Sequence, residues 1–591
     1  MTDEHPSSTP VAGMTPPTPS LNGEVRSEVR PAAAGRTAAT TRDSTHDILE
    51  TIVFVVVLVL LLKTFVAEAF VIPTGSMATT LLGHHKEVAC PACGQVFAVN
   101  CSDEVEPQNG RVFSPTESAI CPNCRAGVAG LSEQSPRTGD RVLVAKFLYD
   151  SGVRRPQRHD VVVFKFPGYP PERVDGYPRS GPFKNHSAMN YIKRLVGLPG
   201  ETIGIYWGDL YVAEGLHQSD PHAPHPLELH WPQYTYADKD VEQLRRDACR
   251  PVNDPNRHFT IIRKPPAQVL ALSRLVYDND QQAKDLIGLA AYQRWVPEAG
   301  HRWQAIDEMR RFHHPGGGGQ LEWLRYRHVV RSPNHTEAPR PRLISDFMAY
   351  NTVNGRSPSA NWVGDLILEA EVTLSDVSPE SELRLELTHG VDRFQARVSL
   401  ATGNCSLWRC TDKSEQPLTA SPVATPLAGR GTHQVRFANV DRRLILWVDG
   451  RLIFGDGLAY DPPPVLGPTE NDLHPASIGV RGGDVTVAHL RLLRDTYYTA
   501  SGSGDGSDVS LTPDIWWNVA KWDEVPAFSD RPLRELVAAR TIFVQAGHYL
   551  CMGDNSPASS DGRDWGLVPQ RLLLGRALLV YYPFSRAGLI R

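Results

Sequence analysis

One apolar segment near the N-terminus limits what the rest of the chain can fold into. Residues 48–66 form a near-continuous apolar run, and its uncharged centre lies between Glu50 and Lys63. Because a membrane-spanning helix usually needs about 20 apolar residues, we predict that residues 47–67 form a single transmembrane helix. The chain has a mean hydropathy of −0.30 and no second apolar run of this length, which excludes a polytopic membrane protein.

Two other interpretations of this run stay open. A helix that is apolar on all sides is also typical of a helix buried in a protein core. The Val-Ala-Glu-Ala sequence at 66–69 has the small residues of a secretory cleavage site. Residues 1–46 are rich in Pro, Ser, Thr and Ala, and we predict that they are disordered because they carry too little apolar surface to fold. Arginines and acids are mixed in this tail, so its charge does not fix the direction of insertion.

The composition excludes several classes of function. With a net charge of −5, the chain has no basic excess, and we expect no nucleic-acid partner. Charged residues make up 21% and hydrophobic residues 41% of the chain, as in ordinary globular proteins. The 591 residues include 9 cysteines, too few for a disulfide scaffold of this size. At about 150 residues per domain, the length predicts about four domains.

A turn directly after the apolar run carries the first candidate catalytic residue. Pro73, Thr74 and Gly75 interrupt the apolar pattern, and Ser76 follows them. A serine hydroxyl on a loop is usually solvated and unreactive. Ser76 therefore needs a neighbouring base before it is a candidate nucleophile.

A lysine within a predicted strand is the second candidate. Residues 191–196 have strand character and end at a Gly-Leu-Pro-Gly turn, and alternation places Tyr191 and Lys193 on the same face. Burial on an apolar face lowers the pKa of a lysine, and a lowered pKa is what a lysine general base requires. Lys165, which has similar flanking residues, and Lys146 stay open as alternative bases.

A polar segment near the C-terminus, residues 547–569, is the third candidate. It is dense in Gly, Asp, Asn and Ser, which is typical of a structured loop. We predict that Asp561 and Arg563 pair and fix this loop, and that Ser559 or Ser560 orients a lysine amine. The alternative is an ordinary polar loop with a surface ion pair worth less than about 1 kcal/mol.

These segments together resemble the type I signal peptidases, the bacterial leader peptidase family of Ser/Lys proteases. PTGSM resembles the nucleophile box, GDRVLVAKF and RHDVVVFKFP the next two strands, YIKRLVGLPGETI the lysine box, and GDNSPASSDGRDWGLVP the last box. The boxes stand in the family's order, directly after the predicted anchor. The resemblance covers residues 48–83, 138–214 and 541–584, and we assign 68–83, 138–214 and 541–591 to the catalytic core.

The resemblance implies a role for each matching residue. Threonine stands at 74 where the family commonly has serine, and glycine stands at 562 where serine is frequent. The implied set is Ser76 as nucleophile, Lys193 as general base, Thr74 and the Ser76 backbone N–H as oxyanion hole, and Ser559, Asp561 and Arg563 as supporting residues.

The activity implied by the resemblance is that of a membrane-bound serine endopeptidase. It would remove N-terminal signal peptides from exported preproteins and would need no cofactor for catalysis. The implied location is the plasma (inner) membrane, in contact with lipid, with one membrane pass and an extracytoplasmic catalytic domain. A self-cleaving repressor-type Ser/Lys protease fits less well, because the chain has a predicted anchor and no helix-turn-helix signal. A membrane-tethered binding protein with an inactive peptidase scaffold is the remaining alternative.

Residues 84–137 form a first insertion with two Cys-Pro-X-Cys pairs. Cys90 and Cys93 form one pair, and Cys121 and Cys124 form the other. Four thiolates suit a tetrahedral structural zinc site and leave no open position for catalysis. Disulfides are the main alternative, because the insertion follows the anchor and is expected outside the cytoplasm. A redox-active pair, and ligands from Cys101, His84 or His85, are weaker alternatives.

A second, larger insertion separates the lysine box from the last box. Residues 215–340 read as a mixed segment, in which Gln281–Trp295 is predicted to be a helix. Residues 341–495 contain regular short strands with alternating polarity, which predict an antiparallel sandwich. Asp449 and Gly450 are the central residues of a predicted hairpin. Residues 496–540 are a connecting segment, in which we interpret three tryptophans as core: Trp516, Trp517 and Trp522.

The sandwich segment resembles a concanavalin-like jelly roll of the laminin-G type. Relatives of that fold often bind sugars or proteins, so a sugar or protein ligand is one expectation and a purely structural insertion is the other. The predicted fold is therefore mainly β. It comprises an antiparallel signal-peptidase core with an N-terminal transmembrane helix, an inserted jelly-roll sandwich and a small Cys-rich module.

Overall fold

The structure is a computed structural model of the chain. It describes residues 44–61, 67–107, 115–150, 152–168, 173–174, 177–178, 189–217, 237–331, 339–355, 361–502, 507–509 and 536–591. Residues 1–43 of the tail predicted to be disordered and the three tryptophans of the connecting segment lie outside these residues, whereas residues 44–46 of that tail begin a helix. Two compact units are distinguished, Met1–Leu60 and Leu61–Arg591, and each is described by itself.

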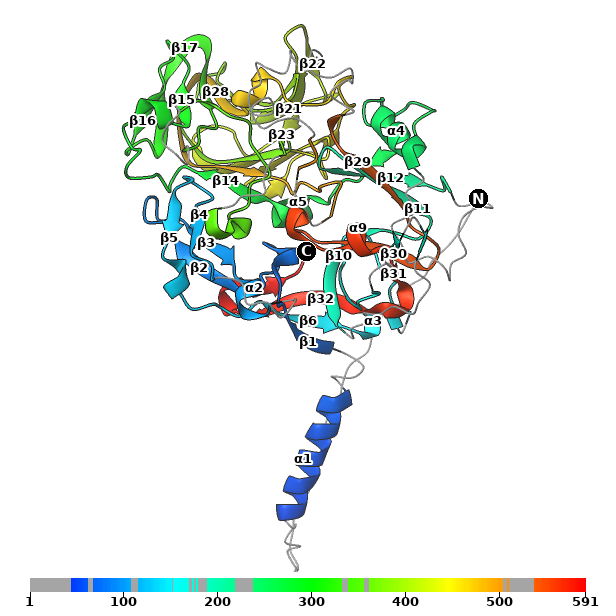
Figure 1. The fold of residues 1–591 in the computed structure, drawn as a ribbon. Helices are drawn as coiled ribbons and strands as arrows, with labels where there is room; N and C mark the ends of the chain where they lie inside the picture. The colour runs from blue at the N-terminus through cyan, green and yellow to red at the C-terminus, as the bar shows by residue number, and fades with distance from the viewer. Residues whose placement is uncertain are drawn as a thin grey trace, which may run out of the picture. The chain divides into compact units, whose positions relative to one another are not determined.

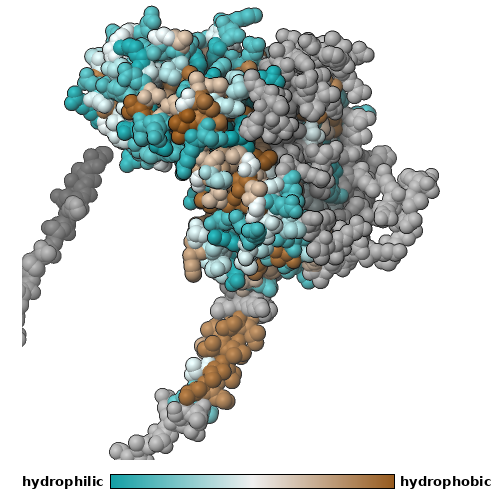
Figure 2. Space-filling model, turned by 60° about the vertical axis from the view of Figure 1, so that its left-hand side comes forward, coloured by the Kyte–Doolittle hydropathy of each residue, from teal (hydrophilic) through white to brown (hydrophobic). Residues whose placement is uncertain are grey.

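Helix α1 (Ser44–Leu61) contains most of the N-terminal apolar run (Figure 1). Its apolar side chains are exposed, with Ile52 at 55% and Leu60 at 57% of full exposure, and they form a brown surface in Figure 2. Within the described part of the chain, no helix combines the length and the apolar character needed to cross a membrane. The transmembrane helix predicted over residues 47–67 therefore stays a prediction.

One antiparallel sheet forms the centre of the region predicted to be the catalytic core. Its strands lie in the order β1-β6-β32-β7-β10-β30-β31, and β33 pairs with β32. Figure 1 shows the red C-terminal strand β32 beside the cyan strand β6, although they are far apart in the sequence. The bounds are β1 (Ala67–Val71), β6 (Arg141–Ala145), β7 (Val161–Lys165), β10 (Asn190–Gly197), β30 (His548–Met552), β31 (Val568–Pro569), β32 (Leu573–Tyr582) and β33 (Gly588–Leu589).

A second antiparallel sheet packs against this centre. Its order is β13-β12-β11-β29, with β11 (Glu201–Tyr206), β12 (Asp209–Glu214), β13 (Thr260–Ile261) and β29 (Ala539–Phe543). A shared core joins the two sheets, because Ile203 of β11 and Ile542 of β29 pack in one buried cluster with Leu550 and Met552 of β30. The lysine box precedes the central insertion in the sequence and the last box follows it. Apolar packing in this cluster holds the two boxes together.

The first insertion leaves and rejoins the core at one point. His85 and Arg137 exchange two backbone hydrogen bonds, and Leu82 and Asp140 lie opposite each other just outside them. Two short hairpins fill the module: β2 (His85–Ala89) with β3 (Val96–Asn100), and β4 (Ser118–Ile120) with β5 (Gly127–Ala129). Helix α2 (Ser102–Val105) follows β3. Because these backbone hydrogen bonds join the two ends of the insertion, the module extends from the side of the core.

The central insertion is mostly antiparallel sheet built around one long strand, β28 (Ala476–Arg494). The main path runs β22-β21-β20-β19-β28-β18-β24-β25-β26. One buried core contains Leu407 of β21 and Leu446 of β25, from opposite halves of this path, so the sheet folds over into two facing layers. The antiparallel pairing and the mainly β class are confirmed, whereas the concanavalin-like type stays a prediction.

After β28, the longest strand of this insertion is β17, with 16 residues. Asp449 and Gly450 both have positive φ between paired strands β25 and β26, which confirms the predicted hairpin. The bounds are α4 (Ala237–Asp247), α5 (Pro266–Leu272), β14 (Arg274–Asp278), β15 (Trp295–Pro297), β16 (Gln304–Ile306), β17 (Arg311–Tyr326), β18 (Leu366–Asp376), β19 (Glu382–His389), β20 (Asp392–Ser399), β21 (Asn404–Cys410), β22 (Glu415–Pro417), β23 (Val423–Ala424), β24 (Gly431–Val440), β25 (Arg443–Val448), β26 (Arg451–Leu452) and β27 (Leu458–Ala459).

The helix predicted over Gln281–Trp295 is wrong. Within this range the structure has one short 3₁₀ turn, Ala290–Tyr292, and the start of strand β15. Gly288 has a φ of 85°, outside the helical region. The backbone N–H of Lys284 donates to the carbonyl of Ala92 in the Cys-rich module at 3.0 Å. Tertiary hydrogen bonding thus replaces the local helical pattern that the sequence suggests.

Candidate active site

The structure brings the predicted serine and lysine together across 117 residues of sequence. Ser76 lies in a short 3₁₀ turn, η2 (Gly75–Met77), and Lys193 lies in the middle of strand β10. Lys193 Nζ donates a hydrogen bond to Ser76 Oγ at 2.7 Å. Ser76 is half-buried.

Lys193 is buried within the central sheet. Strand β10 pairs with β7 on one edge and β30 on the other, and Lys193 is only 4% exposed. Burial lowers the pKa of Lys193 to about 8. Of the two alternative lysines, Lys165 is exposed and Lys146 pairs with Glu68 at 2.7 Å.

The predicted alternation along β10 is confirmed by the packing of its neighbours. Tyr191 and Leu195 belong with one buried cluster, and Ile192 packs against a different one. The Tyr191 ring stacks on Phe166, with centroids 4.5 Å apart, and Lys193 Nζ lies 5.3 Å from the Tyr191 centroid. This aromatic wall excludes water from one side of the amine.

Two buried carboxylates near the lysine are each paired with an arginine. Arg563 donates to both oxygens of Asp561, at 2.9 and 2.7 Å, as predicted. Arg194 donates to both oxygens of Asp554, at 2.7 and 2.7 Å. Burial alone would raise the pKa of each aspartate, but the arginine outweighs it and lowers that pKa. Because these charges are balanced, they draw Lys193 toward its protonated form less strongly than bare carboxylates would.

Ser559 is placed at the site without the predicted hydrogen bond to Lys193. It is fully buried, and its Oγ has no hydrogen-bond partner in the described part of the chain. Gly553 separates it from η2, the turn that carries the proposed nucleophile Ser76 and is called the nucleophile turn below. A Cβ at position 553 would lie 2.2 Å from Ser559 Oγ and 2.4 Å from the carbonyl oxygen of Ser76. Only a glycine fits between these two groups.

Thr74 directly precedes the nucleophile turn. It is half-buried and caps η2 in an extended conformation, without a hydrogen bond from its side chain to the turn. The predicted contribution of its hydroxyl to an oxyanion hole stays a prediction.

Three supporting residues of the nucleophile turn escape the sequence analysis. The backbone N–H of Asn555 donates to the Ser76 carbonyl at 3.0 Å, and Asn555 Nδ2 donates to the Gly75 carbonyl at 3.0 Å. Asn351, from the central insertion, is hydrogen-bonded to Asn555. Tyr350 packs so closely that a Cβ on Gly75 would lie 2.3 Å from its ring. Asn555 belongs to the last box and could have been inferred there, whereas 350 and 351 carry no local signal.

Three groups of described side chains have the spacing of metal ligands, and one of them, His46, Asp47 and Glu50, is exposed on α1. The four predicted cysteines bring their sulfurs within 4.8 Å of one another, and all four are buried. The third group, Asp209, Asp365 and Asp441, has the same spacing. Lys264 pairs with Asp441 and balances part of its charge, so we assign no metal to this group.

Comparison with known proteins identifies the catalytic region. Residues 129–252 and 512–582 match the family described as signal peptidase, peptidase S26. Signal peptidase I of Pseudomonas aeruginosa is 27% identical over 204 residues, which are 30% of this chain and 63% of that protein. The catalytic region is therefore similar to signal peptidases. A probable signal peptidase I-2 of Synechocystis sp. is 48% identical over 42 residues, 7% of this chain and 19% of that protein.

The similarity to signal peptidases covers only part of this chain and part of its relative. The match spans less than two thirds of the Pseudomonas signal peptidase. Lys193 and Asp561 lie within the segments matched to the signal peptidase family, and Ser76 lies outside them. Two hydrogen bonds link Ser76 to the matched segments, one from Lys193 Nζ to its Oγ and one from the Asn555 N–H to its carbonyl.

The solved structures similar to this chain include a carbohydrate-binding module and a galectin. The carbohydrate-binding module CBM66 from Bacillus subtilis is 10% identical, covers 34% of this chain and 95% of its own, and has a TM-score of 0.22. Galectin LEC-6 of Caenorhabditis elegans is 14% identical, covers 22% and 83%, and has a TM-score of 0.17.

Proposed function

We propose that this chain is a serine endopeptidase that cleaves N-terminal signal peptides from exported preproteins, with Ser76 as nucleophile and Lys193 as general base. The observation that carries the proposal is the 2.7 Å contact between Lys193 Nζ and Ser76 Oγ, made by a lysine that is 4% exposed. The signal peptidase family match and the Pseudomonas relative support the reaction and the class of substrate.

The chemistry follows from the protonation state of the lysine. Above a pH of about 8 the Lys193 amine is largely neutral and accepts the proton of the Ser76 hydroxyl. Ser76 Oγ then attacks the scissile carbonyl, and the tetrahedral intermediate collapses to an acyl-enzyme as the Lys193 ammonium protonates the leaving amine. Water, deprotonated by the same amine, hydrolyses the ester and releases the signal peptide.

The oxyanion of the tetrahedral intermediate needs preorganised donors. We assign the Ser76 backbone N–H and the Thr74 hydroxyl to this role, on the basis of the family resemblance and the position of Thr74 at the start of η2. Removal of one such donor typically lowers the rate by about 10²–10³.

Ser559, Asp561 and Arg563 are proposed to support the general base. A buried hydroxyl without a partner costs about 1–3 kcal/mol, and the Ser559 hydroxyl is in this state beside the Ser76 turn. A hydrogen bond from the neutral Lys193 amine to Ser559 would relieve this cost and orient the amine lone pair toward Ser76. The Asp561–Arg563 pair fixes the loop that carries Ser559.

Helix α1 is proposed to attach the enzyme to the membrane. Its apolar side chains are exposed along its length, and the apolar run continues in the sequence to residue 66. Attachment would bring the catalytic region to substrates whose signal peptides are inserted in lipid. Full-length protein should sediment with membranes and be released by detergent but not by alkaline carbonate, whereas release by carbonate would contradict a spanning anchor.

The binding-protein alternative is not favoured, because Ser76 and Lys193 are both present and in contact. A sugar or protein ligand for the sandwich stays a prediction.

Precursor cleavage tests the proposed function. Detergent-solubilised wild type, Ser76→Ala and Lys193→Met are compared on a preprotein with small residues before the cut, with Lys165→Met as the matched control because Lys165 is exposed. We expect cleavage by wild type and by Lys165→Met, and none by the other two. Cleavage by Lys193→Met would refute the assigned base, and cleavage by Ser76→Ala would refute the nucleophile.

A further inference from the structure

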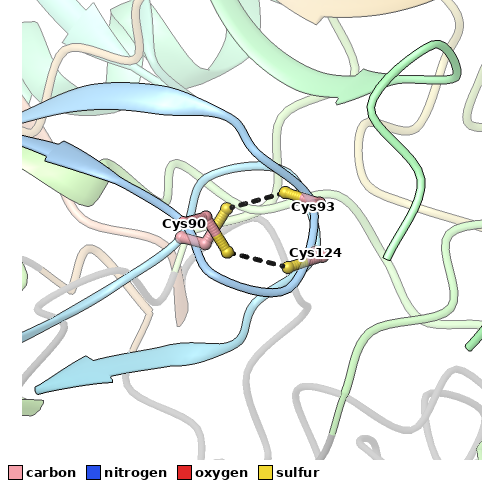
Figure 3. Close-up of side chains that lie close together, drawn as sticks. Cys90, Cys93 and Cys124 are labelled. Atoms are coloured by element: carbon pink, nitrogen blue, oxygen red, sulfur yellow. Dashed lines mark hydrogen bonds between the residues drawn. The ribbon is translucent and has the colours of Figure 1, made fainter. Parts of the chain in front are cut away.

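The Cys-rich module contains a group of thiols that the peptidase chemistry does not use. Cys90 Sγ lies 3.6 Å from Cys124 Sγ, and Cys93 Sγ lies 3.6 Å from Cys121 Sγ. Each close contact therefore joins a cysteine of one Cys-Pro-X-Cys loop to a cysteine of the other. Figure 3 shows the side chains of Cys90, Cys93 and Cys124 pointing toward one another.

The sulfur spacing fits metal coordination better than disulfide bonding. A disulfide has an S–S distance of about 2.05 Å, and the structure records all four cysteines as free. Four sulfurs arranged tetrahedrally around zinc at about 2.3 Å lie about 3.8 Å apart. The observed 3.6 Å contacts and the common limit of 4.8 Å are close to this geometry.

Burial gives a second reason to expect a ligand. None of the four cysteines is more than 7% exposed, and they form one buried cluster with Val88, Val99 and Val128. Each hairpin of the module is only three to five residues long per strand. Small modules of this kind rarely bury enough apolar area to fold alone and commonly depend on a metal or on disulfides.

We propose that Cys90, Cys93, Cys121 and Cys124 bind one structural zinc ion as thiolates. The set is closed, because four sulfurs complete the tetrahedral shell and leave no position for water or substrate. The ion therefore acts on folding and not on peptide hydrolysis. This proposal does not depend on the proposed peptidase function.

The two cysteine loops also form hydrogen bonds with the central insertion. Asn123, between Cys121 and Cys124, donates to the carbonyls of Asp278 and Gln281 at 3.1 and 2.6 Å and accepts from the Asp278 N–H at 2.7 Å. Ala92, in the other loop, accepts from Lys284. Zinc would fix both loops and, through them, the non-helical backbone at 278–284.

A second set of hydrogen bonds leads from the module toward the nucleophile turn. The N–H groups of Glu117 and Ile120 donate to Asn354 Oδ1 and Thr352 Oγ1, at 2.8 and 2.9 Å. These residues follow Asn351, which is hydrogen-bonded to Asn555 beside Ser76. Loss of zinc should therefore loosen a segment that contacts the catalytic turn.

Metal analysis of the purified full-length protein, prepared without added metal, tests the proposal. We expect about one zinc per chain by inductively coupled plasma mass spectrometry, and an intact mass with all cysteines reduced. The four thiols should resist alkylation in the native protein and become reactive after treatment with a strong zinc chelator. Melting temperature should fall in the same chelator and recover when zinc is restored.

Matched variants separate this site from other thiols. Cys121→Ser should lose the zinc, whereas Cys101→Ser, at a buried cysteine of the same module outside the group, should keep it. If Cys121→Ser does not fold, the wild-type alkylation and mass measurements still decide. An intact mass lighter by the hydrogens of two disulfides, iron in place of zinc, or thiols that react without chelator would overturn the proposal. Zinc retained by Cys121→Ser would do so as well.

Discussion

The side-chain amides of Asn351 and Asn555 form two hydrogen bonds with each other. Asn351 Nδ2 donates to Asn555 Oδ1 at 2.7 Å, and Asn555 Nδ2 donates to Asn351 Oδ1 at 2.8 Å. Asn555 Nδ2 also donates to the carbonyl of Gly75, which precedes the proposed nucleophile. A residue of the central insertion thus fixes the side chain that supports the catalytic turn.

Replacement of Asn351 by alanine should lower kcat about tenfold with little change in KM. One lost hydrogen bond is worth about 0.5–1.5 kcal/mol, and about 1.4 kcal/mol in the transition state is a factor of ten. Asn404→Ala, at an exposed position of the same insertion, is the control. A kcat equal to that of wild type would show that the amide pair does not position the turn.

Activity should rise with pH and level off above a pH of about 8. Burial lowers the pKa of Lys193 to about 8, and the neutral amine is the reactive form in the proposed mechanism. Rates of precursor cleavage between pH 6 and 10 provide the measurement. An acidic limb centred near the ordinary lysine value, above 10, would contradict burial of the base.

The same lowered pKa should make Lys193→Met more stable than wild type at neutral pH. The unfolded chain binds a proton at Lys193 up to a pH of about 10.5, whereas the folded chain releases it above about 8. The cost of burying the lysine is therefore fully present below pH 8, at about 3 kcal/mol, and disappears as the pH rises past 10.5.

Chemical denaturation at pH 7 and pH 10 measures this difference. The stability advantage of Lys193→Met should shrink between the two values, and Lys165→Met, at an exposed position, is measured beside it as the control. An advantage that is equal at both pH values would mean that the ionisation of Lys193 is not its source.

Gly553→Ala should abolish most activity. Its Cβ would lie 2.2 Å from Ser559 Oγ and 2.4 Å from the Ser76 carbonyl oxygen, so the nucleophile turn must move. Displacement of a reacting group by about 1 Å can cost about 10² in rate. Gly588→Ala, where an added Cβ meets nothing within 4 Å, should keep activity. Equal rates for both variants would show that the turn tolerates the displacement.

Breaking the Arg194–Asp554 pair should destabilise the fold strongly. Both side chains are at most 1% exposed, and an unpaired buried charge costs about 3–5 kcal/mol. Asp554→Ala should therefore lose about that much in denaturation experiments. Arg137→Ala breaks the exposed pair with Glu87, and it should cost less than about 1 kcal/mol. A small loss for Asp554→Ala would mean that water or another group compensates the arginine.

The sequence identifies residues whose role is set locally and misses those set by tertiary contacts. Lys193 could be nominated because strand alternation and apolar neighbours predict a buried face. The role of Asn351 could not, because its partner lies 204 residues away and no local pattern marks it. The helix predicted over Gln281–Trp295 fails for the same reason, since Asn123 and Ala92 supply hydrogen bonds from outside the segment.

The pairing of β11 determines how a shorter form of this enzyme must be built. Strand β12 pairs with one edge of β11 and strand β29 with the other, and both run antiparallel to it, so β12 and β29 are parallel to each other. A connection between parallel strands needs a crossover of a dozen or more residues. The central insertion is therefore an enlarged crossover, and a minimal enzyme made by deletion must retain a linker of that length to keep the sheet intact.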